Sequence, residues 1–113
     1  MRVLICGSRY PSQAMKDKVL EVVEWVARKG YSLILGGAIG IDSLVEVSAS
    51  KLSVPFEVIR GFPGGYLSRD RVMVSKADLV IAIWDGQSRG TKYTFEYARK
   101  VGKPVVLRQF KQE

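Results

Sequence analysis

The most apolar run of the sequence is Leu79-Val80-Ile81-Ala82-Ile83-Trp84, and Asp85 and Gly86 follow it at once. A continuous apolar run without polar alternation is typical of a strand in a parallel sheet, because helices cover both of its faces. The run Val3-Leu4-Ile5-Cys6, which ends at Gly7, has the same character. We therefore predict that both segments lie inside a parallel sheet and that a turn follows each of them.

Segments with apolar residues at helical spacing alternate with further short apolar runs along the rest of the chain. The clearest helix is expected between Ser12, a good N-cap residue, and Gly30, a good C-terminal stop. In all, the pattern predicts strands over residues 3–6, 31–35, 55–59, 79–84 and 103–107, and helices over residues 12–29, 41–52, 67–76 and 91–101.

This alternation predicts an α/β fold of three layers, in which a five-stranded parallel sheet lies between two layers of helices. We expect the Rossmann-like strand order 3-2-1-4-5, with the flavodoxin-like order 2-1-3-4-5 as the alternative. The length of 113 residues suits one domain, which we expect to span residues 1–113.

Composition excludes several kinds of protein. The chain has no histidine and only one cysteine, Cys6, so we expect neither a disulfide framework nor a metal site, and we predict no cofactor. No apolar segment has the length of a membrane span or of a secretory signal, so we expect a cytoplasmic protein without a membrane partner. The formal charge of +7 favours an anionic partner.

Glycine is concentrated in the four turns that follow strands. Parallel strands end at the same edge of a sheet, so the turns at residues 7–9, 36–40, 61–65 and 85–91 are expected to meet there, and they hold nine of the eleven glycines. Glycine lets backbone N–H groups approach a ligand closely, and helix N-termini add unpaired donors that suit phosphate. We predict an anionic or nucleotide-like site at this edge; the alternative is that the glycines only make tight turns.

Three charged residues stand out in these turns. Arg9 follows the first strand at the point where the strand order reverses, and its guanidinium can pair with phosphate through two bonds. Asp42 and Asp85 are the candidate catalytic residues, placed to contact a ribose hydroxyl or to activate water. The alternatives are that Asp42 stabilises a helix start and that Asp85 forms a turn. The predicted ligand-binding set is Gly7, Ser8, Arg9, Gly36, Gly37, Ala38, Gly40, Arg69, Gly86, Ser88, Gly90 and Thr91.

The common nucleotide-binding signatures are absent from the sequence. No Gly-x-Gly-x-x-Gly follows the first strand, and no acidic residue ends the second strand to bind a ribose. No Gly-Lys-Ser or Gly-Lys-Thr occurs either. The sequence therefore argues against a classical NAD(P) dehydrogenase and against a P-loop NTPase.

Three short motifs, in their order and spacing, resemble the SLOG superfamily, which includes the DprA/Smf DNA-processing proteins, the LOG cytokinin-activating phosphoribohydrolases and the YspA-like proteins. The motifs are Gly7-Ser8-Arg9, Gly-Gly-Ala-Ile-Gly-Ile-Asp at residues 36–42, and Ser88-Arg89-Gly90-Thr91. The YspA-like branch is the most similar: residues 69–74 resemble its Arg-Asn-x-x-Met pattern, and residues 77–86 its Ala-Asp-x-x-Ile-Ala-Phe-Trp-Asp-Gly pattern. The similarity covers about residues 3–107.

The resemblance implies a nucleotide-derived small-molecule ligand, of the nucleoside monophosphate or ADP-ribose kind, and a homo-oligomer. LOG enzymes carry Pro-Gly-Gly-x-Gly-Thr-x-x-Glu, but Thr94 occupies the glutamate position here, so LOG-type hydrolysis is not expected. The likeness to DprA implies single-stranded DNA as the other partner, and a basic rim is expected from Arg60, Arg69, Arg71, Arg89 and Lys92. Two functions stay open: a protein that binds, or binds and hydrolyses, a nucleotide derivative, and a non-catalytic module for single-stranded nucleic acid.

Overall fold

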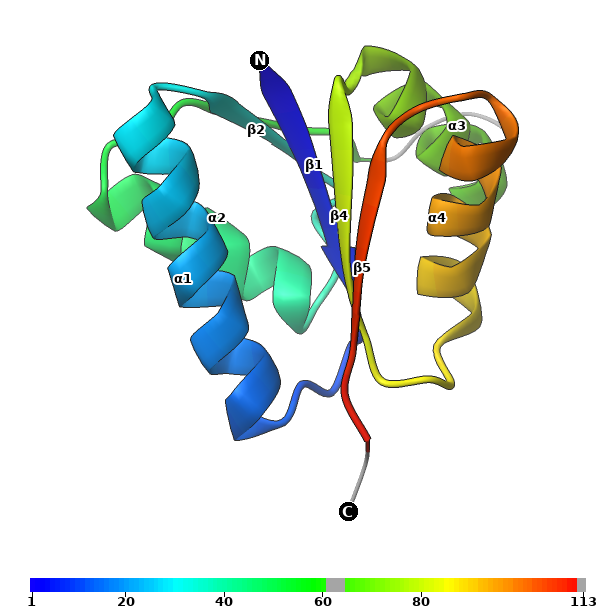
Figure 1. The fold of residues 1–113 in the computed structure, drawn as a ribbon, viewed down its shortest axis with the longest axis horizontal. Coiled ribbons are helices and arrows are strands. Elements are labelled where there is room, and N and C mark those ends of the chain that lie inside the picture. Colours follow the sequence, from blue (N-terminus) through cyan, green and yellow to red (C-terminus); the bar gives the residue numbers. More distant parts are fainter. Residues whose placement is uncertain (61–64, 112–113) are drawn as a thin grey trace.

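The computed structural model describes residues 1–60 and 65–111 and has a parallel sheet at its centre (Figure 1). Every neighbouring pair of its strands is parallel, and the strand order is β3-β2-β1-β4-β5. This confirms the predicted Rossmann-like order over the flavodoxin-like alternative. The strands are β1 (Arg2–Gly7), β2 (Ser32–Leu35), β3 (Phe56–Val58), β4 (Leu79–Trp84) and β5 (Val105–Gln109).

Helices cover both faces of the sheet. In Figure 1, α1 (Gln13–Lys29) and α2 (Ile41–Lys51) lie on one face, and α3 (Tyr66–Lys76) and α4 (Arg89–Lys100) lie on the other. The two signals expected at the ends of α1 are confirmed. The side chain of Ser12 accepts a hydrogen bond from the amide of Met15, and Gly30 ends the helix with a φ of 69°.

Most elements differ from their predicted bounds by one residue at one or both ends, and two of them start two residues away from the predicted position. Helix α4 begins at Arg89 rather than at residue 91, because the side chain of Ser88 acts as its N-cap. Strand β5 covers residues 105–109 rather than 103–107. Pro104 has no N–H to donate to a neighbouring strand, so regular pairing starts after it.

The core lies in two parts, one on each side of the sheet. Val3 and Ile5 of β1 pack toward α1 and α2, whereas Leu4 and Cys6 pack toward α3 and α4. This alternation follows from the two-residue period of a strand. It places Cys6 at the carboxyl end of β1, on the side of α3 and α4.

The carboxyl edge of the sheet is where β1, β2 and β4 meet the helices that follow them. The amide of Ile41, at the start of α2, donates to the carbonyl oxygen of Ser8 at 3.1 Å. The amide of Asp85, after β4, donates to the hydroxyl of Ser8 at 3.2 Å. Ser8 thus joins three of the turns expected at this edge. In the remaining turn, residues 61–64 lie outside the described residues.

Among the described residues, no helix is long and apolar enough to cross a bilayer.

Candidate functional site

A cavity of about 480 Å³ opens at the carboxyl edge of the sheet. Its volume is within the range of small-molecule sites. The end of β1, the turns after β1, β2 and β4, and helices α3 and α4 all contribute to its lining. Among the predicted site residues, the cavity is lined by four small positions, Gly7, Gly36, Ala38 and Gly90. It is also lined by six residues with polar side chains, Arg9, Asp42, Arg69, Asp85, Ser88 and Thr91.

Four other predicted residues do not line the cavity, and they shape the turns instead. Ser8 is 1% exposed and makes the bonds described above. Gly40 has a φ of 84°, and a Cβ there would collide with the carbonyl group of Arg9. Gly37 and Gly86 also have positive φ values, of 73° and 84°. Only glycine adopts such a conformation without strain, so the backbone accounts for these three glycines.

The N-terminus of α4 presents two unpaired donors at the cavity. The N-cap residue Ser88 accepts a bond from the amide of Thr91, and the two hydroxyls are 3.0 Å apart. The amides of Arg89 and Gly90 have no acceptor among the described residues. A Cβ added at Gly90 would meet no atom within 4 Å, so packing does not require a glycine there. This glycine leaves the amides open to a ligand, and the positive end of the helix dipole favours an anion.

The carboxylate of Asp85 forms hydrogen bonds within its own turn. Its Oδ1 accepts hydrogen bonds from the amides of Gln87 and Ser88, both at 2.8 Å. Burial raises the pKa of Asp85, but the amides of Ser88 and Gln87 and the hydroxyl of Ser8 outweigh it, so that the pKa is lowered overall. This carboxylate stays ionised and holds the β4–α4 turn. It also uses the amide of Ser88, which belongs to the predicted ligand-binding set.

A second group of charges lies deeper in the cavity and consists of Asp42, Arg69 and Asp70, here called the carboxylate cluster. Arg69 Nη1 donates to the carbonyl oxygen of Gly36 at 3.0 Å, and Arg69 Nη2 lies 3.5 Å from Asp70 Oδ1. Asp42 Oδ2 accepts from the amide of Ala38 at 3.1 Å. Asp42 and Asp70 are only 9% and 4% exposed. Two buried carboxylates therefore lie close to one guanidinium.

Burial controls the ionisation of this cluster. It raises the pKa of Asp42 to about 6, against the amide of Ala38 and the charge of Arg69, which lower that pKa. Burial also raises the pKa of Asp70, with Arg69 and the hydroxyl of Thr94 opposing it. The pKa of the Cys6 thiol is raised by burial and by both carboxylates, so Cys6 is a neutral part of the cavity wall. A carboxylate with a pKa near neutrality, like that of Asp42, suits proton transfer.

The cavity lining includes residues outside the predicted set, and three of them, Tyr10, Asp70 and Thr94, have polar groups that could contact a ligand. Tyr10 is 78% exposed at the rim, where an aromatic ring can stack on a base. The sequence carries a signal for two of them, because Tyr10 follows Arg9 and Asp70 follows Arg69. No comparable signal marks Thr94, whose hydroxyl donates to the carbonyl oxygen of Gly90 inside α4.

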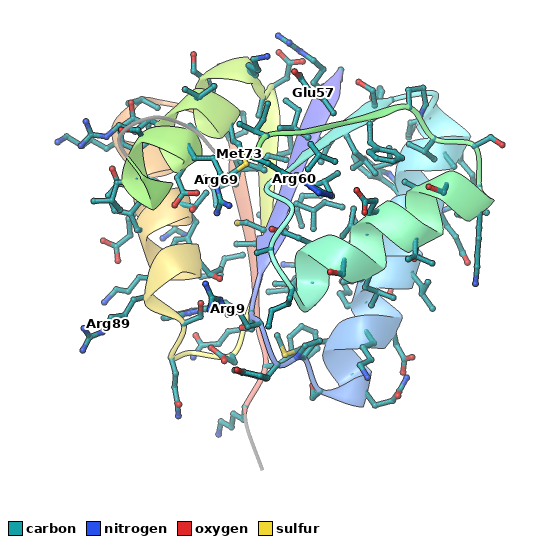
Figure 2. All side chains as sticks on the ribbon, turned by 180° about the vertical axis from the view of Figure 1, so that it is seen from behind. Arg9, Glu57, Arg60, Arg69, Met73 and Arg89 are labelled. Carbon is teal, nitrogen blue, oxygen red and sulfur yellow. The ribbon has the colours of Figure 1, made fainter. Side chains whose placement is uncertain are left out.

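The expected basic rim is only partly assembled. Of its five members, Arg69 and Arg89 line the cavity. In Figure 2, Arg69 reaches from α3 toward the sheet, whereas the side chain of Arg89 projects outward from the start of α4. Arg60 pairs with Glu46 at 2.9 Å, and Lys92 lies 3.7 Å from Glu96. Arg71 donates to the hydroxyl of Tyr93 at 2.8 Å.

The cavity carries no charge excess and no evident metal site. Its lining includes three arginines, Arg9, Arg69 and Arg89, and three aspartates, Asp42, Asp70 and Asp85. The excess positive charge of the chain thus lies elsewhere on the surface. Within residues 1–60 and 65–111, no group of three or more His, Cys, Asp or Glu side chains is placed to hold a metal ion.

Comparison with protein-family models and with curated proteins finds no match to the sequence. Several solved structures are similar in fold. The molybdenum cofactor binding protein from the phototrophic bacterium Rippkaea orientalis matches with a TM-score of 0.83 and 19% identity, over 96% of this chain and 76% of that chain.

Two DNA-processing proteins are also similar. DNA processing protein A (DprA) from Streptococcus pneumoniae matches with a TM-score of 0.82 and 18% identity, over 94% of this chain and 49% of that chain. DNA processing protein A from Helicobacter pylori, whose structure is described for its single-stranded DNA binding mode, has a TM-score of 0.76 and 20% identity, over 95% of this chain and 64% of that chain. At these identities the likeness establishes a three-layer Rossmann-like fold, which proteins with different ligands share.

Proposed function

We propose that this chain binds a nucleotide or nucleotide-derived ligand, of the nucleoside monophosphate or ADP-ribose kind, in the cavity at the carboxyl edge of its sheet. The observation that carries the proposal is the pair of unpaired amides, of Arg89 and Gly90, at the cavity-lining N-terminus of α4. Such amides bind phosphate oxygens well. Arg9, from the turn after β1, adds a positive charge to the same cavity.

The kind of protein is the second part of the proposal. We place the chain in the SLOG superfamily, nearest to its YspA-like branch, on the motifs at residues 7–9, 36–42, 69–74, 77–86 and 88–91. The first, second and last of these contribute residues to one cavity, and so does Arg69 of the third. The Rippkaea orientalis protein is described as binding a cofactor, which supports a small-molecule ligand on this fold. The homo-oligomer and the cytoplasmic location stay predictions; light scattering of the purified chain tests the first.

We further predict that the chain hydrolyses the bound ligand. The best candidate for the general base of this reaction is Asp42. The carboxylate of Asp42 lines the cavity and has a pKa of about 6, whereas that of Asp85 is tied to two amides of its own turn. Chromatography of AMP and ADP-ribose after incubation with the chain and with Asp42→Asn tests this role. If Asp42→Asn hydrolyses the ligand as fast as the unaltered chain, Asp42 is not the general base.

The binding proposal is tested by calorimetry with AMP, ADP-ribose and adenosine. We expect saturable binding of AMP and ADP-ribose and much weaker binding of adenosine, which has no phosphate. Arg9→Ala should weaken binding of AMP by about tenfold, since a charge-assisted bond to phosphate is worth about 1.5 kcal/mol or more. Arg2→Ala is the matched control, because Arg2 is exposed at the opposite end of β1. Absence of binding by both phosphorylated ligands would contradict the proposal.

Single-stranded DNA is the second candidate ligand. The charge of +7 and the similar fold of the Helicobacter pylori protein favour it. Binding of DNA through phosphates falls steeply as salt rises. If an oligonucleotide stabilises the chain against heat at low salt while AMP and ADP-ribose do not, the nucleic-acid function is the correct one.

A further inference from the structure

The carboxylate cluster has the chemistry of a site for hydroxyl groups. An ionised carboxylate has about four acceptor positions. The protein fills only part of them: Asp42 accepts from the amide of Ala38 and interacts with that of Gly36, while Asp70 contacts Arg69 and Thr94. Both carboxylates line the cavity, so their remaining acceptor positions are open to donors on a ligand.

Keeping these carboxylates buried is costly for the folded chain. A buried charge is unfavourable unless it is paired and hydrogen-bonded, and one guanidinium serves both aspartates here. Features that destabilise a core, such as buried charges without enough partners, are most often found at functional sites. A ligand that donates hydrogen bonds to Asp42 and Asp70 would supply the missing partners.

The distance between the carboxylate cluster and the N-terminus of α4 limits which ligands could contact both. The hydroxyl of Thr94 donates to the carbonyl oxygen of Gly90 and also contacts Asp70. Thr94 follows Gly90 by about one turn of α4, which is roughly 5 Å. The carboxylate of Asp70, which contacts Thr94, therefore lies about that far from the unpaired amides. A phosphorylated ribose spans a similar distance between its 5′-phosphate and its ring hydroxyls. A second phosphate at the cluster would be repelled by two negative charges.

We propose that Asp42 and Asp70 accept hydrogen bonds from the 2′- and 3′-hydroxyls of a ribose whose 5′-phosphate lies on the N-terminus of α4. The ligand is then a ribonucleotide or ribose phosphate rather than its deoxy counterpart, and its base lies toward Tyr10 at the rim. This inference rests on the proposed nucleotide site and specifies which sugar that site accepts. A site of this kind would discriminate against DNA, which lacks the 2′-hydroxyl.

The test compares AMP, 2′-deoxy-AMP, 2′,3′-dideoxy-AMP and inorganic phosphate by calorimetry on the full chain at about pH 8, which is above the pKa of about 6 of Asp42. We expect AMP to bind about tenfold or more tightly than 2′-deoxy-AMP and tighter still than the dideoxy compound, because each lost bond to a charged acceptor is worth at least about 1.5 kcal/mol. This comparison uses the unaltered chain and so does not depend on how any variant folds.

Two substitutions attribute the preference to the cluster. Asp70→Asn keeps the size of the side chain but removes its charge, so the ratio of AMP to 2′-deoxy-AMP affinity should fall to about threefold or less. Asp17→Asn, at an exposed position on α1, should keep the full ratio. Equal binding of AMP and its deoxy forms would refute the sugar assignment and leave the phosphate site standing. Failure of AMP, its deoxy forms and phosphate alike to bind would refute the proposed function itself.

Discussion

Arg69 Nη1 donates a hydrogen bond to the carbonyl oxygen of Gly36 at 3.0 Å, and this bond joins α3 to the turn after β2. Glycine favours this close approach, because a Cβ at position 36 would make tight contacts, 3.2 Å from Arg69 Cζ and 3.0 Å from Asp42 Oδ2. Glycine at position 36 thus allows α2 and α3 to bring opposite charges together on one cavity wall. We expect the stability of this cavity wall to depend on the contact.

Arg69→Ala should destabilise the fold by about 3 kcal/mol at pH 8, because it leaves two buried carboxylates without their cation. The loss should be smaller at pH 5, since the raised pKa values of Asp42 and Asp70 let both carboxyls take up protons more readily there. Urea unfolding at the two pH values measures this. Arg28→Ala, at an exposed position on α1, should change stability by less than about 0.5 kcal/mol. Equal losses for Arg69→Ala at both pH values would contradict the pairing.

Asp42→Asn should stabilise the folded chain at pH 8 but not near pH 4. Because the folded-state pKa of Asp42 is raised from 3.8 to about 6, the folded chain binds more protons than the unfolded chain in this range. Stability therefore falls as the pH rises through it, by up to about 3 kcal/mol for this group. The variant keeps an acceptor for the amide of Ala38 but cannot ionise, so its stability should depend less on pH. Denaturant titrations between pH 4 and 8 that showed parallel curves for both chains would count against a buried, ionised Asp42.

Gly90→Ala should raise stability and weaken ligand binding. Alanine is favoured over glycine in a helix by roughly 1 kcal/mol, and its Cβ would meet no protein atom. The same methyl group would stand in front of the amides that we assign to phosphate. A thermal melt and an AMP titration measure the two effects. A variant that binds AMP as tightly as the original chain would show that phosphate lies elsewhere.

Arg89→Pro removes one of the two unpaired amides without disturbing α4. Proline is well tolerated at the first helical position, and Ser88 before it already has extended backbone angles, φ −60° and ψ 115°. Binding of AMP should weaken about tenfold or more, because a charge-assisted bond is lost. Arg89→Ala keeps the amide and removes a side chain that projects outward, so its effect should be small (Figure 2). Equal affinities of the two variants would exclude the amide as a phosphate ligand.

The fold could be predicted because local and global signals agree along this chain. The continuous apolar runs at residues 3–6 and 79–84 are covered by helices on both faces, and Ser12 and Gly30 bound α1 as expected. The largest errors lie at two boundaries where a single residue decides. Ser88 extends α4 by two residues at its start, and Pro104 delays β5.

The edge that carries the site was also predictable, but the role of each residue was not. Glycine in a turn can serve a ligand or the backbone, and the sequence does not separate Gly90 from Gly37 and Gly40, whose φ values are positive. Whether a polar group is free depends on its neighbours in space. The carboxylate of Asp85 is used by its own turn, and Asp70 becomes part of the cavity only because α3 packs beside α4.

The central claim is that phosphate binds to the amides at the start of α4, and nuclear magnetic resonance of the ¹⁵N-labelled chain tests it most directly. In a titration with AMP, we expect the amide signals of Arg89 and Gly90 to move the furthest and to saturate together. In Arg89→Pro, which has no amide proton at position 89, the remaining Gly90 signal should respond much less. If these two signals stay in place while those of exposed lysines shift without saturation, phosphate does not bind at α4 and the account is wrong.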